Sequence, residues 1–407
     1  MSMPGREAVL LLCAGETLLG ALPPLPTELP WWPEAWDVCA AAKARYGLDV
    51  VVLRLLTTSV ERMPGGTVTY LAEVDPAACA GLPLTPWDGA DPLAPHPLRQ
   101  AWARPGGPQE QLRWARERLA ASGIAVTGPA TQVKTWNLSA VWRMPTDAGE
   151  LWFKVVPDFF AHEGAIMSAL GPPAVPAVYA AEPGRTIMAN VSGSNFDAAG
   201  AALPPMIEKL VELQADWIGR ADELLTLGLP DRRLTAELPR IEVVVSGHLG
   251  EVPPDRRDAL LGLVDDLPRR FAAIEACGVP DTLTHGDFHP GNVLGRPGGH
   301  AIMDWGDSCL SHPLTDELAF ARPLSEPDRA LAGQVFGTAW RRVVPGCDPE
   351  RAATLLRPVL PLLAAVTYAT FCARIEPDER IYHAADVGDY LRLAATEAPE
   401  LRRSRHR

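Results

Sequence analysis

A short polar loop between apolar stretches constrains this chain more than any other feature. Residues 283–294 read LTHGDFHPGNVL, and residues 301–307 read AIMDWGD, so that Asp304 follows Asn292 by twelve positions. Apolar residues flank both pieces, while the first contains one carboxylate, one amide, two histidines and two glycines. This pattern predicts a tight loop that short buried strands hold in place.

The predicted elements change in type along the chain. A β-rich stretch, interrupted by a helix at residues 162–170, precedes a mostly helical part that begins near residue 204 and contains only short β-like pieces around 281–304. The strand-like runs of the β-rich stretch are residues 130–144, 150–156, 175–180 and 185–191. A β-rich half followed by a helical half predicts a module of two lobes.

The first 82 residues predict a separate small α/β domain. Its expected strands are residues 8–14, 48–56 and 67–74, with a helix at 34–46 that ends before Gly47. Residues 83–108 are rich in proline and glycine, which is typical of a linker, and we place the main domain boundary there.

Composition excludes several functions. Fifty acidic and 37 basic residues give a formal charge of −13, which disfavours binding to nucleic acid or anionic lipid. Seven scattered cysteines without a Cys-x-x-Cys pair argue against a disulfide framework or a structural zinc. The apolar run 358–373 is too short to cross a bilayer, so we expect a soluble cytoplasmic protein without a membrane partner. The oligomeric state stays open.

The loop resembles the H-x-D-x-x-x-x-N loop of kinases, and Asp304 stands where their metal-binding aspartate follows. Gly286, a second histidine at 289, and Asp-Trp in place of Asp-Phe make it most similar to the aminoglycoside phosphotransferase family, which includes choline kinases. The resemblance covers about residues 109–400. It implies an α+β, bilobal, protein-kinase-like fold, with the β-rich N-lobe at 109–188 and the hinge and helical C-lobe at 189–407.

The resemblance implies transfer of the γ-phosphoryl group of ATP to a hydroxyl of a small molecule, with Mg²⁺. Asp287 is then the catalytic base, which orients the acceptor hydroxyl and takes its proton. Asn292 and Asp304 provide the hard oxygen ligands that Mg²⁺ requires. An aminoglycoside, an amino alcohol and a sugar are all open as the acceptor.

Four further residues around the loop receive supporting roles from the resemblance. His285 ties the loop to the strand that carries Asp304, and His289 packs within the loop. Asp307 either faces the metal site or lies on an exposed turn. Asp316 in the sequence DELA is expected to buttress the helix that follows it.

The resemblance also assigns residues to the nucleotide. Lys154, in the apolar run LWFKVV, pairs the α- and β-phosphates and is held by Glu163 at the start of a helix. The phosphate-covering turn, TWNLSAV, contains no glycine, so Ser139, and secondly Asn137, are expected to contact the β-phosphate. The hinge residues that would meet adenine are Met188, Ala189 and Val191.

Three matters stay open at the level of sequence. The order of elements in residues 1–82, together with the stretch 40–56, faintly resembles a Nudix domain that is degenerate and non-catalytic, since Ala44 and Arg45 occupy the positions of metal-binding glutamates. The alternative function is a non-catalytic nucleotide-binding module, a pseudokinase partnered by the N-terminal domain. Acidic and aromatic residues near the C-terminus either bind the acceptor or serve as surface and packing: Glu376, Asp378, Glu379, Asp386, Asp389, Tyr368, Phe371, Tyr382 and Tyr390.

Overall fold

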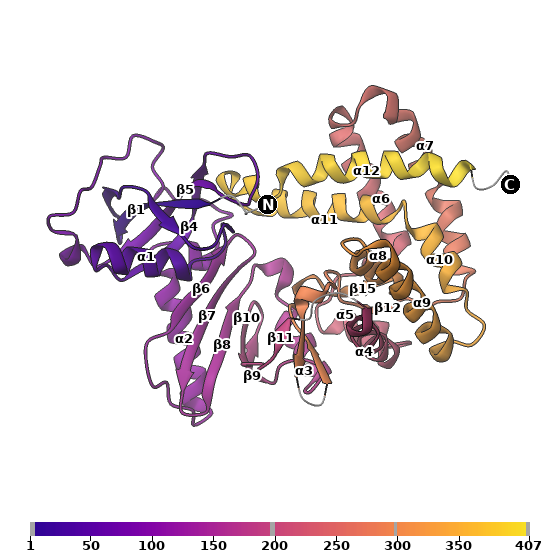
Figure 1. Cartoon of the computed structure of the whole chain (residues 1–407), viewed down its shortest axis with the longest axis horizontal. Helices are drawn as coiled ribbons and strands as arrows, with labels where there is room; N and C mark the ends of the chain where they lie inside the picture. Colours follow the sequence, from indigo (N-terminus) through magenta and orange to yellow (C-terminus); the bar gives the residue numbers. More distant parts are fainter. Residues whose placement is uncertain (1–4, 196–199, 297–298, 404–407) are drawn as a thin grey trace. The chain divides into compact units, whose positions relative to one another are not determined.

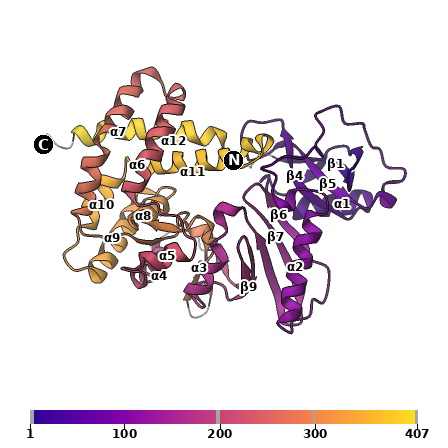
Figure 2. The same cartoon turned by 180° about the vertical axis from the view of Figure 1, so that it is seen from behind.

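The computed structural model describes residues 5–195, 200–296 and 299–403, and it divides into two compact units (Figures 1 and 2). The first unit contains Met1–Phe159, Tyr179–Asn190 and Phe371–His383. The second contains Phe160–Val178, Val191–Thr370 and Ala384–Arg407. Residues 1–82 and 109–159 therefore share one compact unit, and the four-part division predicted above stays a prediction.

The N-terminal sheet of the first unit combines parallel and antiparallel pairing. Its strand order is β2-β1-β5-β4, with β3 also on β1, and only β1 and β5 pair in parallel. The elements are β1 (Arg6–Ala14), β2 (Thr17–Ala21), β3 (Leu25–Thr27), α1 (Trp36–Tyr46), β4 (Val50–Thr58) and β5 (Gly66–Val74). The predicted strands and helix are present, whereas β2 and β3 were not predicted, because β3 lies in a proline-rich stretch that reads as a loop.

Both faces of this sheet are covered. Alternate residues of β1 enter two different clusters: Ala8, Leu10 and Leu12 pack in one, and Leu11 and Cys13 pack in the other. The continuous apolar run of β1 reflects this burial on both sides, since a strand that faces water on one side alternates instead. Helix α1 contributes Val38 and Ala42 to the first cluster and ends at Gly47, whose φ of 71° is left-handed.

A second sheet in the first unit has the strand order β6-β7-β8-β10-β9. Its elements are β6 (Thr131–Trp136), β7 (Ser139–Thr146), β8 (Gly149–Val155), β9 (Val178–Glu182) and β10 (Arg185–Ala189), and α2 (Gly107–Ala121) covers one face. Phe153 lies between two tryptophans in its core, with ring centroids 5.6 Å from Trp114 and 5.5 Å from Trp142. Part of the predicted linker, residues 83–108, packs against this sheet, since Trp102 is buried in the same cluster.

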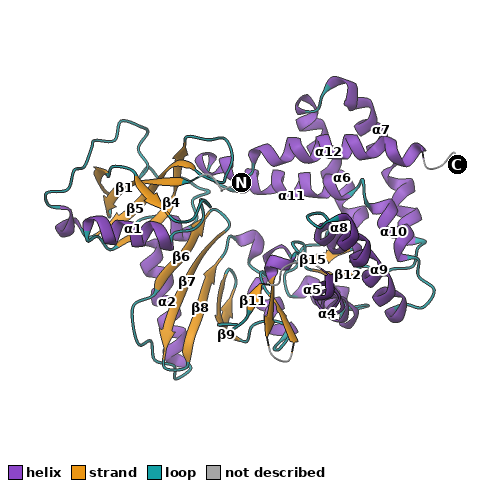
Figure 3. Ribbon diagram, viewed as in Figure 1, coloured by secondary structure: helices purple, strands orange, loops and turns teal. Residues whose placement is uncertain are grey.

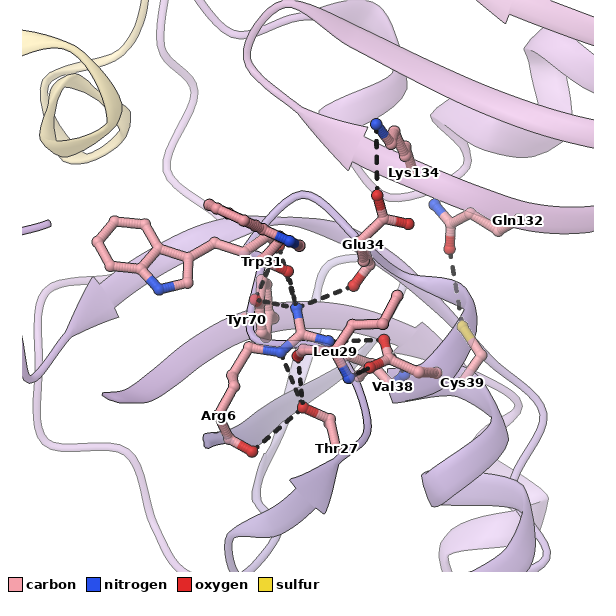
Figure 4. A network of polar contacts seen from close by, with 12 residues as sticks. Arg6, Thr27, Leu29, Trp31, Glu34, Val38, Cys39, Tyr70, Gln132 and Lys134 are labelled. Atoms are coloured by element: carbon pink, nitrogen blue, oxygen red, sulfur yellow. Dashed lines mark hydrogen bonds and ion pairs between the residues drawn. The ribbon is translucent and has the colours of Figure 1, made fainter. Parts of the chain in front are cut away.

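A buried arginine organises the N-terminal sheet (Figure 4). The Arg6 guanidinium donates to the Asp37 carboxylate of α1 at 2.6 Å, to the Tyr70 hydroxyl and to backbone carbonyls that include Glu34. Arg6 and Asp37 are 1 % and 3 % exposed. Removing one partner from such a pair typically costs about 3–5 kcal/mol, because it leaves a buried charge without compensation.

Edge strand β6 joins the two sheets of the first unit. Gln132 donates from Nε2 to the Val52 carbonyl at 2.7 Å, and its Oε1 accepts from the Val52 amide at 2.9 Å. The Thr135 hydroxyl donates to the Leu53 carbonyl, and Lys134 forms an ion pair with Glu34 (Figure 4). The Gln132 side chain thus bonds both backbone groups of Val52, as the backbone of a neighbouring strand would. These contacts connect the N-terminal sheet with the second sheet.

The segment Phe371–His383 returns the chain to the first unit. It contains the end of α11 (Leu360–Arg374) and the 3₁₀ helix η8 (Pro377–Tyr382). Tyr382 is buried in the N-terminal core cluster, 5.7 Å from the ring of Trp32. Glu376 and Glu379 are buried as well, so this segment contributes to the interior of the first unit.

The second unit is mainly helical (Figure 3). Its helices are α3 (Glu163–Leu170), α4 (Leu203–Asp216), α5 (Ala221–Thr226), α6 (Leu234–His248), α7 (Pro254–Glu275), α8 (Leu314–Ala321), α9 (Glu326–Val343), α10 (Pro349–Leu356), most of α11, and α12 (Ala384–Arg403). Its strands are β11 (Ser194–Asn195), β12 (Thr282–Thr284), β13 (Val293–Arg296), β14 (Gly299–Ile302) and β15 (Cys309–Ser311). β12 pairs with β15, and β13 lies between β11 and β14.

Among the described residues, no single helix is long and apolar enough to cross a membrane. Helices α10 and α11 reach the required length and composition only as a pair, and they are bent by 55° at the break between them.

Burial raises the pKa of Glu379 to about 8, and the nearby Glu376 carboxylate adds to this effect while Arg54 and Arg99 oppose it. In the unfolded chain this carboxyl ionises near its ordinary value of 4.5. The folded state therefore binds more protons between these two values, and its stability falls as the pH rises through them.

We predict that Glu379→Gln removes this loss of stability at rising pH. The variant should match the wild type near pH 4.5 and exceed it above pH 8 by more than about 1 kcal/mol in the free energy of unfolding. Urea unfolding between pH 4.5 and 9 measures the difference, with Glu110→Gln, at an exposed ion pair of the same unit, as the control. Parallel pH profiles for Glu379→Gln and the wild type would contradict the buried titration.

Candidate active site

The polar loop lies in the second unit between β12 and β13. Asp287 is at its centre, with 55 % of its side chain exposed. The Asn292 amide donates from Nδ2 to the Asp287 carbonyl at 2.9 Å and approaches the Asp287 carboxylate at 3.4 Å. The structure thus brings the predicted base and one predicted metal ligand into direct contact.

The β13–β14 hairpin brings the second predicted metal ligand close. Met303 donates its amide to the Asn292 carbonyl at 2.8 Å, so Asp304 follows directly after the partner of Asn292. Asp304 is exposed and adopts a left-handed conformation with φ 62° and ψ 65°. It is the one non-glycine residue with positive φ among the described residues. Such conformations cost of order 1–3 kcal/mol and concentrate at functional sites.

His285 bridges the loop and the strand end. It is fully buried, and its Nε2 lies 2.8 Å from the Met303 carbonyl, while Nδ1 accepts from the Asp287 amide at 3.3 Å. These two contacts specify the tautomer that carries its proton on Nε2. The ring also packs against Trp305 at a centroid distance of 4.7 Å.

His289 and Gly286 shape the rest of the loop. His289 accepts the Gly291 amide on Nδ1 and lies with Nε2 3.7 Å from the Asp287 carboxylate. Burial lowers the pKa of His289, and the Asp304 carboxylate opposes that change. Gly286 has a φ of 83°, and a Cβ there would lie 2.2 Å from the Asp307 carbonyl, so glycine is required for this approach.

Asp316 holds the loop rather than only its own helix. It lies in the first turn of α8, is 1 % exposed, and accepts the amides of His285 at 2.8 Å and Gly286 at 2.9 Å. The Gln214 side chain of α4 donates to it as well, at 2.9 Å. Burial raises the pKa of Asp316 to about 6, although the three donors favour the ionised form. Its predicted role as a helix buttress therefore needs correction, because its carboxylate is directed at the loop backbone.

Two tyrosines of the second unit stack on each other, and one of them senses several carboxylates. Tyr368 of α11 stacks on Tyr390 of α12 at 5.4 Å, and the Tyr390 hydroxyl accepts from Arg322 at 2.8 Å. Burial raises the pKa of Tyr368, and Tyr390 together with the carboxylates of Asp386, Asp287 and Asp307 raises it further. These carboxylates therefore lie within electrostatic reach of one phenol.

The predicted nucleotide residues are distributed over both units. Lys154 is on β8, opposite Thr186 of β10 and Val141 of β7. Glu163 is the first residue of α3 in the second unit, and it is buried. The predicted roles of both residues stay predictions.

The predicted hinge runs from β10 into the second unit. Met188 is buried and lies opposite Trp152, and Ala189 ends β10 opposite Leu151. Val191 is half-buried and begins the next part of the second unit. Their assignment to adenine stays a prediction.

Both predicted phosphate-turn residues are buried in the first unit. Ser139 accepts the Trp136 indole N–H at 2.9 Å, and Asn137 is bonded to residues of the segment Phe371–His383. Glu376 of that segment, for which the sequence left acceptor binding and packing open, belongs to the interior. Glu376 pairs with Arg54 and Arg99 in the interior, which leaves it unavailable to an acceptor.

The donor set suits magnesium better than a softer metal. Among the described residues, no group of three or more His, Cys, Asp or Glu side chains is arranged to hold a metal ion. Mg²⁺ does not need such a cage, because it usually binds through one or two protein oxygens together with substrate phosphates and water. The carboxylate of Asp304 and the amide oxygen of Asn292, on adjacent ends of one hairpin, fit that requirement.

Comparison with known families identifies this arrangement. A model of the phosphotransferase enzyme family matches residues 129–356, which is more than half of the chain and includes the whole loop and Asp304. The chain belongs to this family. It is thus a phosphotransferase of the small-molecule kinase type, and the predicted family is confirmed. The match leaves residues 1–82 outside, and no comparison supports their resemblance to a Nudix domain.

Two solved structures are similar to the chain. A macrolide 2′-phosphotransferase from Brachybacterium faecium is 18 % identical, with a TM-score of 0.50, and the match covers 68 % of this chain and 98 % of that one. A choline/ethanolamine kinase family protein from Mesorhizobium loti is 19 % identical over 72 % of this chain and 97 % of its own, with a TM-score of 0.48. The first of these, together with the mixed α and β content, confirms the predicted protein-kinase-like α+β fold. No curated protein sequence matches the chain significantly.

Asp316→Ala should lower turnover by at least about tenfold. The change leaves the amides of His285 and Gly286 without their acceptor, and an orphaned buried donor costs about 1–3 kcal/mol. Steady-state kinetics and thermal unfolding measure the two effects. Asp348→Ala, which removes an N-cap from α10, is the control: it should lower stability by about 1 kcal/mol without changing turnover. Unchanged turnover in Asp316→Ala would contradict the role of this carboxylate.

Proposed function

We propose that this phosphotransferase transfers the γ-phosphoryl group of ATP to a hydroxyl of a small molecule, with Mg²⁺ as the metal. One observation carries the proposal: Asn292 contacts Asp287 directly and pairs with the residue before Asp304. This contact supports the proposal, because a carboxylate and two hard oxygen donors within one loop and hairpin are the set that phosphoryl transfer needs.

Asp287 acts on the acceptor. As the acceptor oxygen forms its bond to the γ-phosphorus, the bond from that phosphorus to the β,γ-bridging oxygen breaks and ADP leaves. The acceptor proton passes to the Asp287 carboxylate, which is exposed and so open to a hydroxyl. The Asn292 amide, bonded to the Asp287 carbonyl, keeps the backbone of the base in place.

Asn292 and Asp304 would hold the metal, which when bound neutralises phosphate charge and aligns the phosphates. His285 maintains the spacing of the two pieces, since it contacts both the Met303 carbonyl and the Asp287 amide. The buried Asp316 fixes the start of the loop from the opposite side.

A cationic acceptor suits the groups around the base. Asp307 and Asp386 lie with Asp287 within electrostatic reach of Tyr368, whose ring stacks on Tyr390. Carboxylates favour an ammonium group, and aromatic faces attract cations. We therefore propose an acceptor that carries both a hydroxyl and an amine or ammonium group.

The alternative, a nucleotide-binding module without catalysis, finds less support. The base, both oxygen ligands and the buried support of the loop are all present in one connected arrangement. A module that only binds nucleotide would not need an exposed carboxylate at position 287.

Asp287→Asn should reduce turnover by about 10²–10⁴, which is the usual contribution of a placed base. The asparagine keeps the shape of the side chain, so Mg·ATP should bind as tightly as to the wild type. Coupled ATP-consumption kinetics and calorimetry separate the two properties. Turnover within threefold of the wild type would remove Asp287 from the role of base.

Asp304→Ala should abolish the metal dependence of nucleotide binding, because it removes the only carboxylate proposed as a metal ligand. Titration of the variant with ATP, with and without Mg²⁺, measures this. Asp328→Ala, at a half-buried carboxylate in the first turn of α9 that accepts the Gly200 amide, is the matched control and should retain the Mg²⁺ effect. A Mg²⁺ effect of wild-type size in Asp304→Ala would contradict the assignment.

The proposed acceptor class is tested with matched compounds. Each amine-bearing alcohol in an ATP-consumption panel is paired with its neutral analogue of similar size. The amine should have the higher kcat/KM, and Asp386→Asn should reduce this preference by raising KM for the amine. Equal kcat/KM within all pairs that are consumed would contradict a cationic acceptor.

A further inference from the structure

Gln214 connects helix α4 to the buried carboxylate that holds the start of the loop. It lies in the last turn of α4 and is 0 % exposed. Its Nε2 donates to Oδ2 of Asp316 at 2.9 Å, and the same oxygen accepts the His285 amide at 2.8 Å. Oδ1 of Asp316 accepts the Gly286 amide at 2.9 Å. Three N–H donors therefore converge on one buried carboxylate, all of them within the second unit.

The backbone of Gln214 also contacts the strand that leads into the loop. The Thr282 hydroxyl, at the start of β12, donates to the Gln214 carbonyl at 2.8 Å, and both residues are completely buried. One residue of α4 thus contacts the strand before the loop through its carbonyl and the helix after the loop through its side chain.

Only the donor half of the Gln214 amide has a partner. Its Oε1 is buried and accepts no hydrogen bond from the described residues. A buried acceptor without a donor destabilises a fold, whereas an unbranched apolar side chain of the same length, such as methionine, would fill the space without that cost. Stability alone therefore does not explain a glutamine at this position. The bond from Nε2 to Asp316 is the contact that only the amide provides.

This bond favours the ionised form of Asp316. Oδ2 already accepts two N–H groups, so both of its lone pairs are used, and a proton would have to bind Oδ1. A protonated carboxyl is a weaker acceptor than a carboxylate, and the Gly286 amide, next to Asp287, would then lose its charged partner. Burial raises the pKa of Asp316 to about 6, and the bonds from His285, Gly286 and Gln214 oppose this rise. Loss of the Gln214 donor therefore raises that pKa further.

Several other titratable side chains are near Asp316, namely His285 of the loop, Cys309 of β15, His312 before α8 and Glu317 of α8. Burial raises the pKa of Cys309 to about 12, and the Asp316 carboxylate adds to that rise. Burial lowers the pKa of His312 to about 4 and raises that of Glu317 to about 8. Each of these groups is present in the wild type and in a Gln214 variant, so a difference between the two proteins reports on Asp316.

We propose that Gln214 is a positioning residue for phosphoryl transfer, which keeps the Asp316 carboxylate charged so that it retains the Gly286 amide beside Asp287. The inference rests on the proposed function, in which Asp287 is the base. Gln214 touches neither substrate nor metal in this account. Its effect on turnover passes through Asp316, and it therefore depends on pH.

Gln214→Met tests the inference in the full-length protein, because methionine keeps the length of the side chain and removes both polar atoms. Wild-type turnover should fall as the pH drops through about 6. In the variant this fall should begin about one to two pH units higher, the equivalent of one hydrogen bond to a charged group. Turnover at pH 7 should then be about fivefold below the wild type and approach it near pH 9.

ATP consumption with the most active amine-bearing alcohol of the panel above gives the two pH profiles. Gln111→Met is the matched control. Gln111 is a buried glutamine of the first unit, and its Oε1 accepts from Arg185 at 2.7 Å. The midpoint of the acid fall should be the same in this variant as in the wild type.

The Gly286 amide proton reports on Asp316 without any substrate. Its resonance in the wild-type protein should move upfield as the pH falls through about 6, because its acceptor loses charge. The midpoint of this titration should be about one to two pH units higher in Gln214→Met. If the variant does not fold, the wild type still decides: a Gly286 resonance that is constant between pH 5 and 8 would overturn the proposal.

The remaining outcomes separate this inference from the proposed function. Equal midpoints in the folded variant and the wild type would overturn the positioning role and leave the proposed function intact. A lower melting temperature with equal midpoints would show a role in stability alone and would also overturn it. Absence of ATP turnover in the wild type at every pH would overturn the proposed function and, with it, the role of Gln214 in phosphoryl transfer.

Discussion

The Asp316 carboxylate is the constraint on which the site depends. One buried group accepts the amides of His285 and Gly286, and Gln214 orients it. Without this acceptor, the buried amide of His285 and the adjacent amide of Gly286 would lose their partner. Asp287 follows this start of the loop directly and is exposed. A buried carboxylate thus holds the backbone beside the exposed residue that we propose as the base.

The β13–β14 hairpin brings Asp304 close to Asn292 through pairing of residues that are near each other in sequence. The Met303 amide donates to the Asn292 carbonyl, so the two proposed oxygen donors stand at the two ends of one hairpin, and Asp304 itself has a left-handed backbone. His285 contacts both the loop, at the Asp287 amide, and the end of the hairpin, at the Met303 carbonyl, and thereby connects the two. The energetic cost of the left-handed backbone at Asp304 is offset by the surrounding hydrogen bonds of Met303 and His285, as expected where backbone strain occurs at a functional site.

Sequence reasoning found the loop because its chemistry is local. The residues at 285, 287, 292 and 304 lie within twenty positions, and the apolar runs beside them indicate a loop between short strands. The strands β1, β4, β5 and β8 were predictable for a similar reason, since apolar runs and turn residues report directly on burial.

Sequence reasoning did not find the contacts that join distant parts of the chain. Glu376 reads as one of several acidic residues on a charged loop, and only the fold brings it to Arg54 and Arg99 in a buried cluster. The sequence does not indicate which residues Tyr382 and Gln132 contact, because tyrosine and glutamine also occur on protein surfaces. Asp316 was assigned to its own helix, since its bonds to residues thirty positions earlier have no periodic pattern.

Calorimetric titration of the wild-type protein with ATP tests the central claim most directly, which is that the loop and Asp304 form a metal-dependent nucleotide site. The account predicts one ATP per chain in the presence of Mg²⁺ and much weaker binding when the metal is chelated. Absence of binding with Mg²⁺, or equal affinity with and without it, would contradict the account.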